Sequence, residues 1–225
     1  MHRAQRITLP RMPHQQATLP CWEGSLESCE VWLAVAGMGA QRAAIAARTI
    51  LNAWKPDLLL IAGVAGALAP ELRVGDVVAA REVVTPRKEM TAPRVLPAPF
   101  TGRLLSLDQV LVSATEKQEA WAHYGEPRLL AVEMETSAAA AVAEKQGVAW
   151  AALRAISDTA GEGLPLDFNR LRSRDGDLPT SRVALAAIRQ PASIPGLIRL
   201  GGNTNRAAEA LAAVIERWLR CCEKP

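Results

Sequence analysis

The sequence predicts an α/β fold, a three-layer sandwich of helices around a mixed, largely parallel sheet. Short apolar runs alternate with segments of helical periodicity along most of the chain, and the links between them are short. The run DLLLIAGVAGAL (57–68) is almost continuously apolar, which is typical of a parallel strand covered on both faces. With 225 residues and no repeat or linker, the chain is expected to form a single domain over 1–225.

The N-terminal half is expected to hold two strands around one helix. Residues 1–28 are irregular and rich in proline, so no element is expected there. The run EVWLAVAG (30–37) is apolar, ends in glycine and is too short for a helix, which predicts a strand. Apolar residues at helical spacing follow until Pro56, which predicts a helix before the strand at 57–68; this strand is expected to run into a glycine-rich turn.

Three further strands are expected over 72–84, 125–135 and 147–163. A helix is expected over 136–147, ended by a glycine that suits its C-terminus. The stretch 85–108 holds four prolines and little periodicity, which predicts a loop or flap.

The C-terminal part is expected to end in a helix. Residues 164–179 are charged and irregular at their centre. Pro191 and Pro195 interrupt the next stretch, and helical spacing returns from about Asn205 to Arg220.

Composition excludes several classes of protein. The hydrophobic fraction of 49% and the charged fraction of 22% are ordinary for a soluble globular protein, and the net charge of +3 is too small to indicate nucleic-acid binding. The four cysteines form no CxxC pair and have no histidine nearby, so no metal site is expected. No apolar stretch is long enough for a transmembrane helix and no secretory signal is visible, which favours a cytoplasmic location.

A dinucleotide cofactor is not expected either. The glycines of GMG (37–39) lie between a strand and a helix, but the third glycine of a dinucleotide fingerprint would fall at Arg42. We therefore expect no cofactor.

Polar or glycine residues gather at the carboxyl ends of three predicted strands, where ligands bind in open α/β sheets. Each group alone has a structural explanation: a tight turn, caps for a helix, or a pair between Arg154 and Asp158. Together they indicate a site. The three groups are Gly63-Val64-Ala65-Gly66, Glu133-Met134-Glu135 and Arg154-Ala155-Ile156-Ser157-Asp158.

These residue types suit cleavage of an N-glycosidic bond. A carboxylate can accept two hydrogen bonds from the cis diol of a ribose. An aspartic acid in an apolar setting can hold a proton and give it to a leaving base, while an arginine orients water or an anion. The transition state would resemble an oxocarbenium ion, as in glycoside hydrolysis.

At these residues the sequence resembles the superfamily of nucleoside phosphorylases and methylthioadenosine/S-adenosylhomocysteine nucleosidases. The resemblance covers roughly 31–160, in the family's order, and the part from LPLDFNR onward is most similar to the hopanoid-associated branch. The matching blocks are AGMGAQRAAIAA, KPDLLLIAGVAGALAPELRVGDVV, AVEMETSAAAAVAEKQGV and LRAISDTA.

The resemblance implies a role for each candidate residue. Asp158 would protonate the purine at N7, Glu135 would bind the ribose hydroxyls, and Arg154 would help place the attacking water or anion. Met134 would lie against the sugar and Ser157 beside the base. The remaining substrate-binding residues would be Glu133, Gly63, Val64, Ala65 and Gly66. Because successive strand residues face oppositely, Glu133 is expected to point away from the side that carries Glu135.

Three positions depart from the family. Phosphorylases place arginine and serine where this chain has Ile61 and Val64, which favours water over phosphate as the nucleophile. The family's first strand, with its general-base glutamate, has no counterpart before Val31. Lys117 or Gln118 stands where the family has an aromatic residue that stacks on the base.

The sequence thus predicts a nucleosidase that hydrolyses a purine nucleoside, with adenine as the base, or a nucleoside-bearing lipid intermediate such as adenosylhopane. A phosphate-dependent phosphorylase and a nucleoside-binding protein without catalysis are the alternatives. The resemblance also implies a homodimer or larger homo-oligomer.

Overall fold

The computed structural model describes residues 5–7, 19–125, 128–173 and 178–221. Its larger sheet has six strands in the order β6-β5-β7-β8-β4-β9, and β5 also pairs with β9, so that the sheet curls back on itself. The strands are β4 (Leu58–Ala67), β5 (Val77–Val84), β6 (Glu89–Thr91), β7 (Phe100–Ser106), β8 (Leu129–Glu133) and β9 (Ala149–Asp158).

The sheet is mixed, as predicted. The pairs β4–β9, β5–β7 and β7–β8 are parallel, whereas β4–β8, β5–β6 and β5–β9 are antiparallel. The pair β4–β9 runs the full length of both strands and aligns Gly63 with Arg154. A register shift after Ala65 then aligns Gly66 with Asp158. This pairing brings two of the predicted groups to the same end of the sheet.

A second, antiparallel sheet joins β1 (Gln5–Ile7), β2 (Cys21–Leu26) and β3 (Cys29–Ala34). Its first two strands lie in the segment for which no element was expected. The expectation was wrong for β1 and β2, because pairing with β3 stabilises stretches whose own sequence has little strand periodicity.

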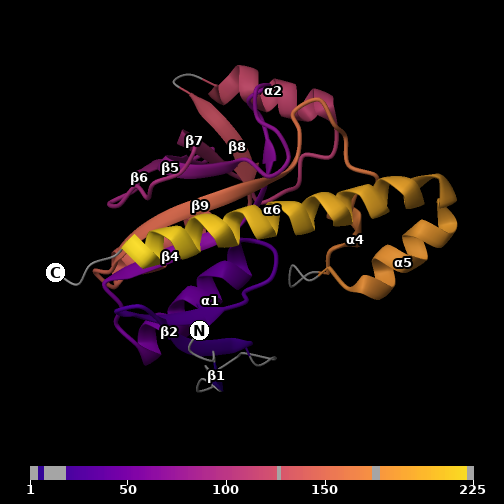
Figure 1. Ribbon diagram of the computed structural model, residues 1–225. Helices are drawn as coiled ribbons and strands as arrows, with labels where there is room; N and C mark the ends of the chain where they lie inside the picture. The colour runs from indigo at the N-terminus through magenta and orange to yellow at the C-terminus, as the bar shows by residue number, and fades with distance from the viewer. Residues whose placement is uncertain (1–4, 8–18, 126–127, 174–177, 222–225) are drawn as a thin grey trace.

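Helices cover both faces of the larger sheet, which gives the predicted layers. On one face α1 (Ala40–Ala53) and α3 (Thr136–Lys145) pack on each other and on a core that includes Trp150, Ala152 and Ile156. On the other face α6 (Ile194–Cys221) runs along β9 and covers Ala151, Leu153 and Ala155 (Figure 1). The alternation of β9 residues between these two layers is the period-two pattern of a fully buried strand.

A third apolar cluster lies beneath α2 (Ala114–Tyr124), where Leu105, Leu129 and Val132 meet partly buried residues of the helix. The smaller elements α4 (Phe168–Leu171), α5 (Thr180–Arg189) and the 3-10 turn η1 (Pro191–Ser193) lead into α6. Figure 1 shows α4 and α5 beside the N-terminal end of α6. No helix in the described ranges is both long and apolar enough to cross a lipid bilayer.

Three expectations for single elements were wrong. The stretch 85–108 is not a loop throughout, because it contains β6 and the buried central strand β7. The last helix begins at Ile194 rather than near Asn205, since Pro195 lies in its first turn, where a missing backbone N–H costs nothing. The GVAG segment (63–66) belongs to β4 and does not form a turn.

The start of α2 offers a test of local stability. Ser113 Oγ accepts a hydrogen bond from Glu116 N, and the Glu116 carboxylate accepts one from Ser113 N, which makes a complete capping box. Ser113→Ala is expected to lower the free energy of unfolding by about 1 kcal/mol, measured by denaturant unfolding. Thr115→Ala, an exposed change two positions later, serves as the control and should leave stability within about 0.5 kcal/mol of the parent. Equal stability of the parent and the Ser113 variant would contradict the role of this cap.

Candidate active site

A buried guanidinium joins the second half of β9 to the junction between β8 and α3. Arg154 Nη2 donates to Glu133 Oε2 and, at 2.8 Å, to Thr136 Oγ1. Arg154 Nη1 donates to Glu135 Oε2 at 3.2 Å, and the Arg154 side chain is only 3% exposed. A buried charge needs such partners, because leaving it unpaired is very costly.

Glu133 also closes the first turn of α3. Its Oε2 accepts from the backbone N–H groups of Glu135 and Thr136, at 2.9 and 2.8 Å, and from the Thr136 hydroxyl. A carboxylate at a helix N-terminus satisfies free N–H groups and is favoured by the helix dipole. Its other oxygen, Oε1, is buried and has no hydrogen-bond partner among the described residues.

Glu135 lies nearer the surface and bridges to a different segment. Its Oε1 accepts from the backbone N–H of Gly39, at 2.7 Å, just before α1 begins. Gly39 has a φ of 98°, a backbone region that favours glycine. A methyl group added there would also lie 2.7 Å from Arg172 Nη2, so this guanidinium lies against the same segment.

Glu133 and Glu135 therefore both form ion pairs with Arg154. The expectation that Glu133 points away from the side of Glu135 was wrong. Residues two apart in a strand face the same side, so alternation itself places Glu133 and Glu135 together, and the turn through Met134 into α3 leaves Glu135 within reach of Arg154.

The glycines of β4 provide the space that the charged side chains of β9 occupy. A Cβ at Gly63 would lie 2.4 Å from Arg154 Nη1, and one at Gly66 would lie 2.9 Å from Asp158 Oδ2. Any larger residue at these two positions would displace the side chain opposite it in the β4–β9 register. The glycines thus serve the site by lacking a side chain.

The other two residues of this segment contact the site through their backbones. Val64 O accepts from Arg154 Nη1 at 3.4 Å, and Ala65 O accepts from the Ser157 hydroxyl at 3.3 Å. The Ala65 side chain is in the core beneath α1 and α3, and Val64 packs toward the α6 face.

Asp158 ends β9 and both of its oxygens accept hydrogen bonds. Ser157 Oγ donates to Oδ1 at 2.7 Å, and Lys117 Nζ donates to Oδ2 at 2.5 Å. The pair that the sequence allowed between Arg154 and Asp158 is not formed, because each charge has a different partner. Lys117 is the more deeply buried member of its pair, with a side chain 1% exposed.

The sequence placed Lys117 or Gln118 at the position of the family's stacking residue. The ion pair between Lys117 and Asp158 was not predicted. Residues 114–124 were not assigned to a helix, so the side that each residue faces could not be inferred. The signal that would have found the helix is the S-x-x-E pattern of Ser113 and Glu116. Lys117 follows directly and faces inward, whereas Gln118 is exposed.

The loop after β9 forms hydrogen bonds with the Lys117 amine. Lys117 Nζ donates to the carbonyl oxygens of Thr159 and Glu162, at 2.8 and 2.9 Å. The pKa of Glu162 is lowered, first by the hydrogen bond from Thr159 N–H, and further by the Thr159 hydroxyl and the positive charges of Arg199 and Lys117, against a smaller opposing effect of burial. This carboxylate therefore adds negative charge beside the Lys117–Asp158 pair.

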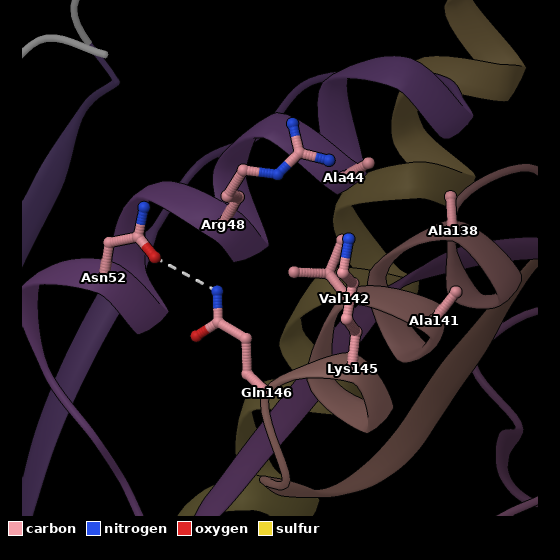
Figure 2. A pocket seen from close by; sticks show the side chains of 8 residues that line it. All are labelled: Ala44, Arg48, Asn52, Ala138, Ala141, Val142, Lys145 and Gln146. Carbon is pink, nitrogen blue, oxygen red and sulfur yellow. Dashed lines mark hydrogen bonds between the residues drawn. The ribbon is translucent and has the colours of Figure 1, made fainter.

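A separate hollow of about 530 Å³ opens between α1 and α3. In Figure 2 its floor is made of small apolar side chains from both helices, and Gln146 Nε2 donates to Asn52 Oδ1 across one end, at 3.1 Å. None of the candidate residues at the strand ends lines it. Its lining residues are Ala44, Arg48, Asn52, Ala138, Ala141, Val142, Lys145 and Gln146.

The chain is similar to known proteins in sequence and in fold. The 5′-methylthioadenosine/S-adenosylhomocysteine nucleosidase of Geobacillus kaustophilus is 29% identical over 181 residues, which are 66% of this chain and 75% of that protein. The solved structure of the nucleosidase of the same name from S. pneumoniae, with a transition-state inhibitor, has a TM-score of 0.70 at 18% identity and covers 98% of this chain and 90% of its own. Futalosine hydrolase of Helicobacter pylori has a TM-score of 0.68 at 17% identity, covering 96% and 88%.

A family model gives the broader assignment. The model described as the phosphorylase superfamily matches residues 3–100 and 89–189, well over half of the chain. Its match spans β4, β8 and β9, the three strands that carry the candidate site. The chain belongs to the phosphorylase superfamily.

Proposed function

We infer that the protein hydrolyses the N-glycosidic bond of a purine nucleoside and releases the free base. The observation that carries this proposal is the juxtaposition along β9. Arg154 holds Glu135 at the edge of the site, and Asp158 lies four residues further along the same strand beside Gly66. A diol-binding carboxylate and an acid for the leaving base are thus carried by neighbouring elements. The names of the relatives, which are nucleosidases and a futalosine hydrolase, support the same reaction.

Glu135 is proposed to bind the ribose hydroxyls. It is the more exposed of the two glutamates, with a side chain 17% exposed against none for Glu133. Its bonds to Gly39 N–H and Arg154 use one lone pair on each oxygen, so each can accept one more hydrogen bond. Met134 would contact the sugar, and Glu133 Oε1 leaves one further acceptor for a water molecule or a substrate hydroxyl.

Asp158 is proposed to protonate the base as the bond to the sugar breaks. A neutral base is a better leaving group than an anion, and a positioned acid supplies the proton in the transition state. Ser157 holds one oxygen of this carboxyl group in place. Water, oriented with the help of Arg154, would then add to the anomeric carbon of the oxocarbenium-like sugar.

The charges at the site favour water over phosphate as the nucleophile. Arg154, its buried cation, already contacts two carboxylates. Lys117 is likewise paired with Asp158. At the positions where phosphorylases hold phosphate with arginine and serine, Ile61 is buried in the core and Val64 is apolar.

Phosphorolysis is the second candidate, and one observation favours it. The side chains of Arg42 and Arg172 both lie against the glycine segment before α1, since an added Cβ would meet Arg42 Nη1 at Gly37 and Arg172 Nη2 at Gly39. Guanidinium groups that lie against one backbone segment suit an oxyanion. A nucleoside-binding protein without catalysis is the third candidate.

The finer substrate is also proposed. Adenine as the base follows from the names of the relatives. A lipid-bearing substrate such as adenosylhopane is supported by the resemblance of the C-terminal part to the hopanoid-associated branch and by the exposed Ile194 and Ile198 at the start of α6. A homodimer or larger homo-oligomer is expected from the family.

The nucleophile can be identified directly. Purified protein incubated with a panel of adenine and 6-oxopurine nucleosides, with and without inorganic phosphate, is expected to release free base and free ribose in both conditions, measured by chromatography. Base release that requires phosphate and yields ribose 1-phosphate would replace the hydrolase by the phosphorylase. Binding of a nucleoside in calorimetry without any base release would support the binding protein.

The two carboxylates should affect different kinetic constants. Asp158→Asn is expected to lower kcat by about 10²–10⁴-fold, because the acid for the leaving base is lost. Glu135→Gln is expected to raise KM for the nucleoside by about 10-fold or more, the usual cost of a hydrogen bond to a charged group. Asp57→Asn, at an exposed position, is the control and should change neither constant. Wild-type kcat in the Asp158 variant would exclude it as the acid.

The space at Gly63 gives a third test. Gly63→Ala forces Arg154 to move and is expected to lower kcat/KM by about 10²-fold, the effect of a misplacement of roughly 1 Å. Gly161→Ala adds the same atom where no other atom lies within 4 Å and should keep the parent's activity. If both alanine variants are equally active, Arg154 does not need its present position.

A further inference from the structure

The Lys117 side chain is a buried amine with all of its hydrogen bonds made. Its three N–H donors have three partners: Asp158 Oδ2, Thr159 O and Glu162 O. A lysine ammonium has three donors and no acceptor. Lys117 therefore has no donor left for a substrate, and any effect on the reaction must pass through these partners.

The carboxylate that Lys117 contacts is the proposed acid, yet both of its oxygens accept hydrogen bonds. Ser157 donates to one and Lys117 to the other, which is the pattern of an ionised carboxylate. An ionised carboxylate has no proton to give to a leaving base. The proton has to come from a neighbour. Of the two donors, the Ser157 hydroxyl is a much weaker acid than an ammonium, so the source is Lys117 Nζ at 2.5 Å.

We propose that Lys117 is a positioning residue that stores the proton which Asp158 delivers to the leaving base. This inference rests on the proposed function. As the glycosidic bond breaks, its electron pair goes to the base nitrogen that leaves the sugar. Lys117 Nζ passes a proton to the ionised carboxylate of Asp158, and Asp158 gives this proton to a second nitrogen of the base. Water adds to the anomeric carbon, its surplus proton goes to solvent, and solvent returns a proton to the amine.

The geometry suits both protonation states of the amine. A neutral amine keeps two N–H donors and gains one lone pair. The two donors can stay on the carbonyl oxygens of Thr159 and Glu162, while the lone pair faces the proton now on Asp158. No partner is left unsatisfied by the transfer, which avoids the usual cost of an unpaired buried group.

The surrounding charges support a protonated resting state. Glu162, whose carboxylate lies beside the pair, interacts with both Lys117 and Arg199 of α6. Glu116, the neighbour of Lys117 on α2, is held in the capping box by the N–H groups of Val112 and Ser113.

The test compares side chains that differ in length, charge and readiness to lose a proton. Lys117→Met keeps the length without charge, and Lys117→Arg keeps a charge that does not give up its proton. Both are expected to lower kcat by about 10²-fold with little change in KM, since the substrate is not touched. The rate of the Met variant should rise as the pH is lowered, because solvent must then protonate Asp158. Gln118→Met, at the exposed neighbouring position, is the control.

Two further measurements separate this role from a purely structural one. In the Asp158→Asn background, Lys117→Met is expected to add no further loss of kcat, because the lysine acts through Asp158. As an independent measurement, Lys117→Ala is assayed below its own unfolding temperature with added methylammonium, which should restore activity, and with guanidinium, which should not.

The outcomes are distinct. Three results would each overturn the proton-storing role without affecting the proposed hydrolase. The first is a wild-type kcat and pH profile in the Arg variant. The others are equal rescue by methylammonium and guanidinium, and additive losses of kcat in the double variant. A wild-type protein that releases no base from any nucleoside would overturn the proposed function, and this inference with it.

Discussion

The buried guanidinium of Arg154 is the constraint on which the site depends. It joins β9 to the end of β8, to the first turn of α3 and, through Glu135, to the segment before α1. Removing one partner of a buried ion pair typically costs about 3–5 kcal/mol, because the other charge is left uncompensated. The parallel register of β4 and β9 makes the arrangement possible, since it sets a glycine opposite the arginine.

The same network organises the chemistry of the site. Each buried cation is matched with a carboxylate, Arg154 with two and Lys117 with one. The two carboxylates proposed to contact the substrate, Glu135 and Asp158, are thereby each held by a buried cation. Preorganised partners of this kind reduce the cost of reorganisation when charge develops on the sugar and the base.

Most of the fold could be predicted because its signals are local. The apolar run of β4 and the alanine-rich α3 lie within one or two residues of their expected bounds. The strands β1, β2 and β7 and the first part of α6 were not predicted. These segments carry proline or weak periodicity, and they are stabilised by neighbours that are distant in the sequence, such as β5 and β8 for β7.

The sequence by itself determined which residues could do chemistry: two glutamates, an arginine, an aspartate and a glycine-rich strand, all at predicted strand ends. Only the tertiary structure decided their partners. The turn after β8 leaves Glu135 on the same arginine as Glu133, and the packing of α2 brings Lys117 to Asp158 across 41 positions of the chain. Side-chain pairing of this kind depends on how elements pack, and periodicity within one element carries no information about it.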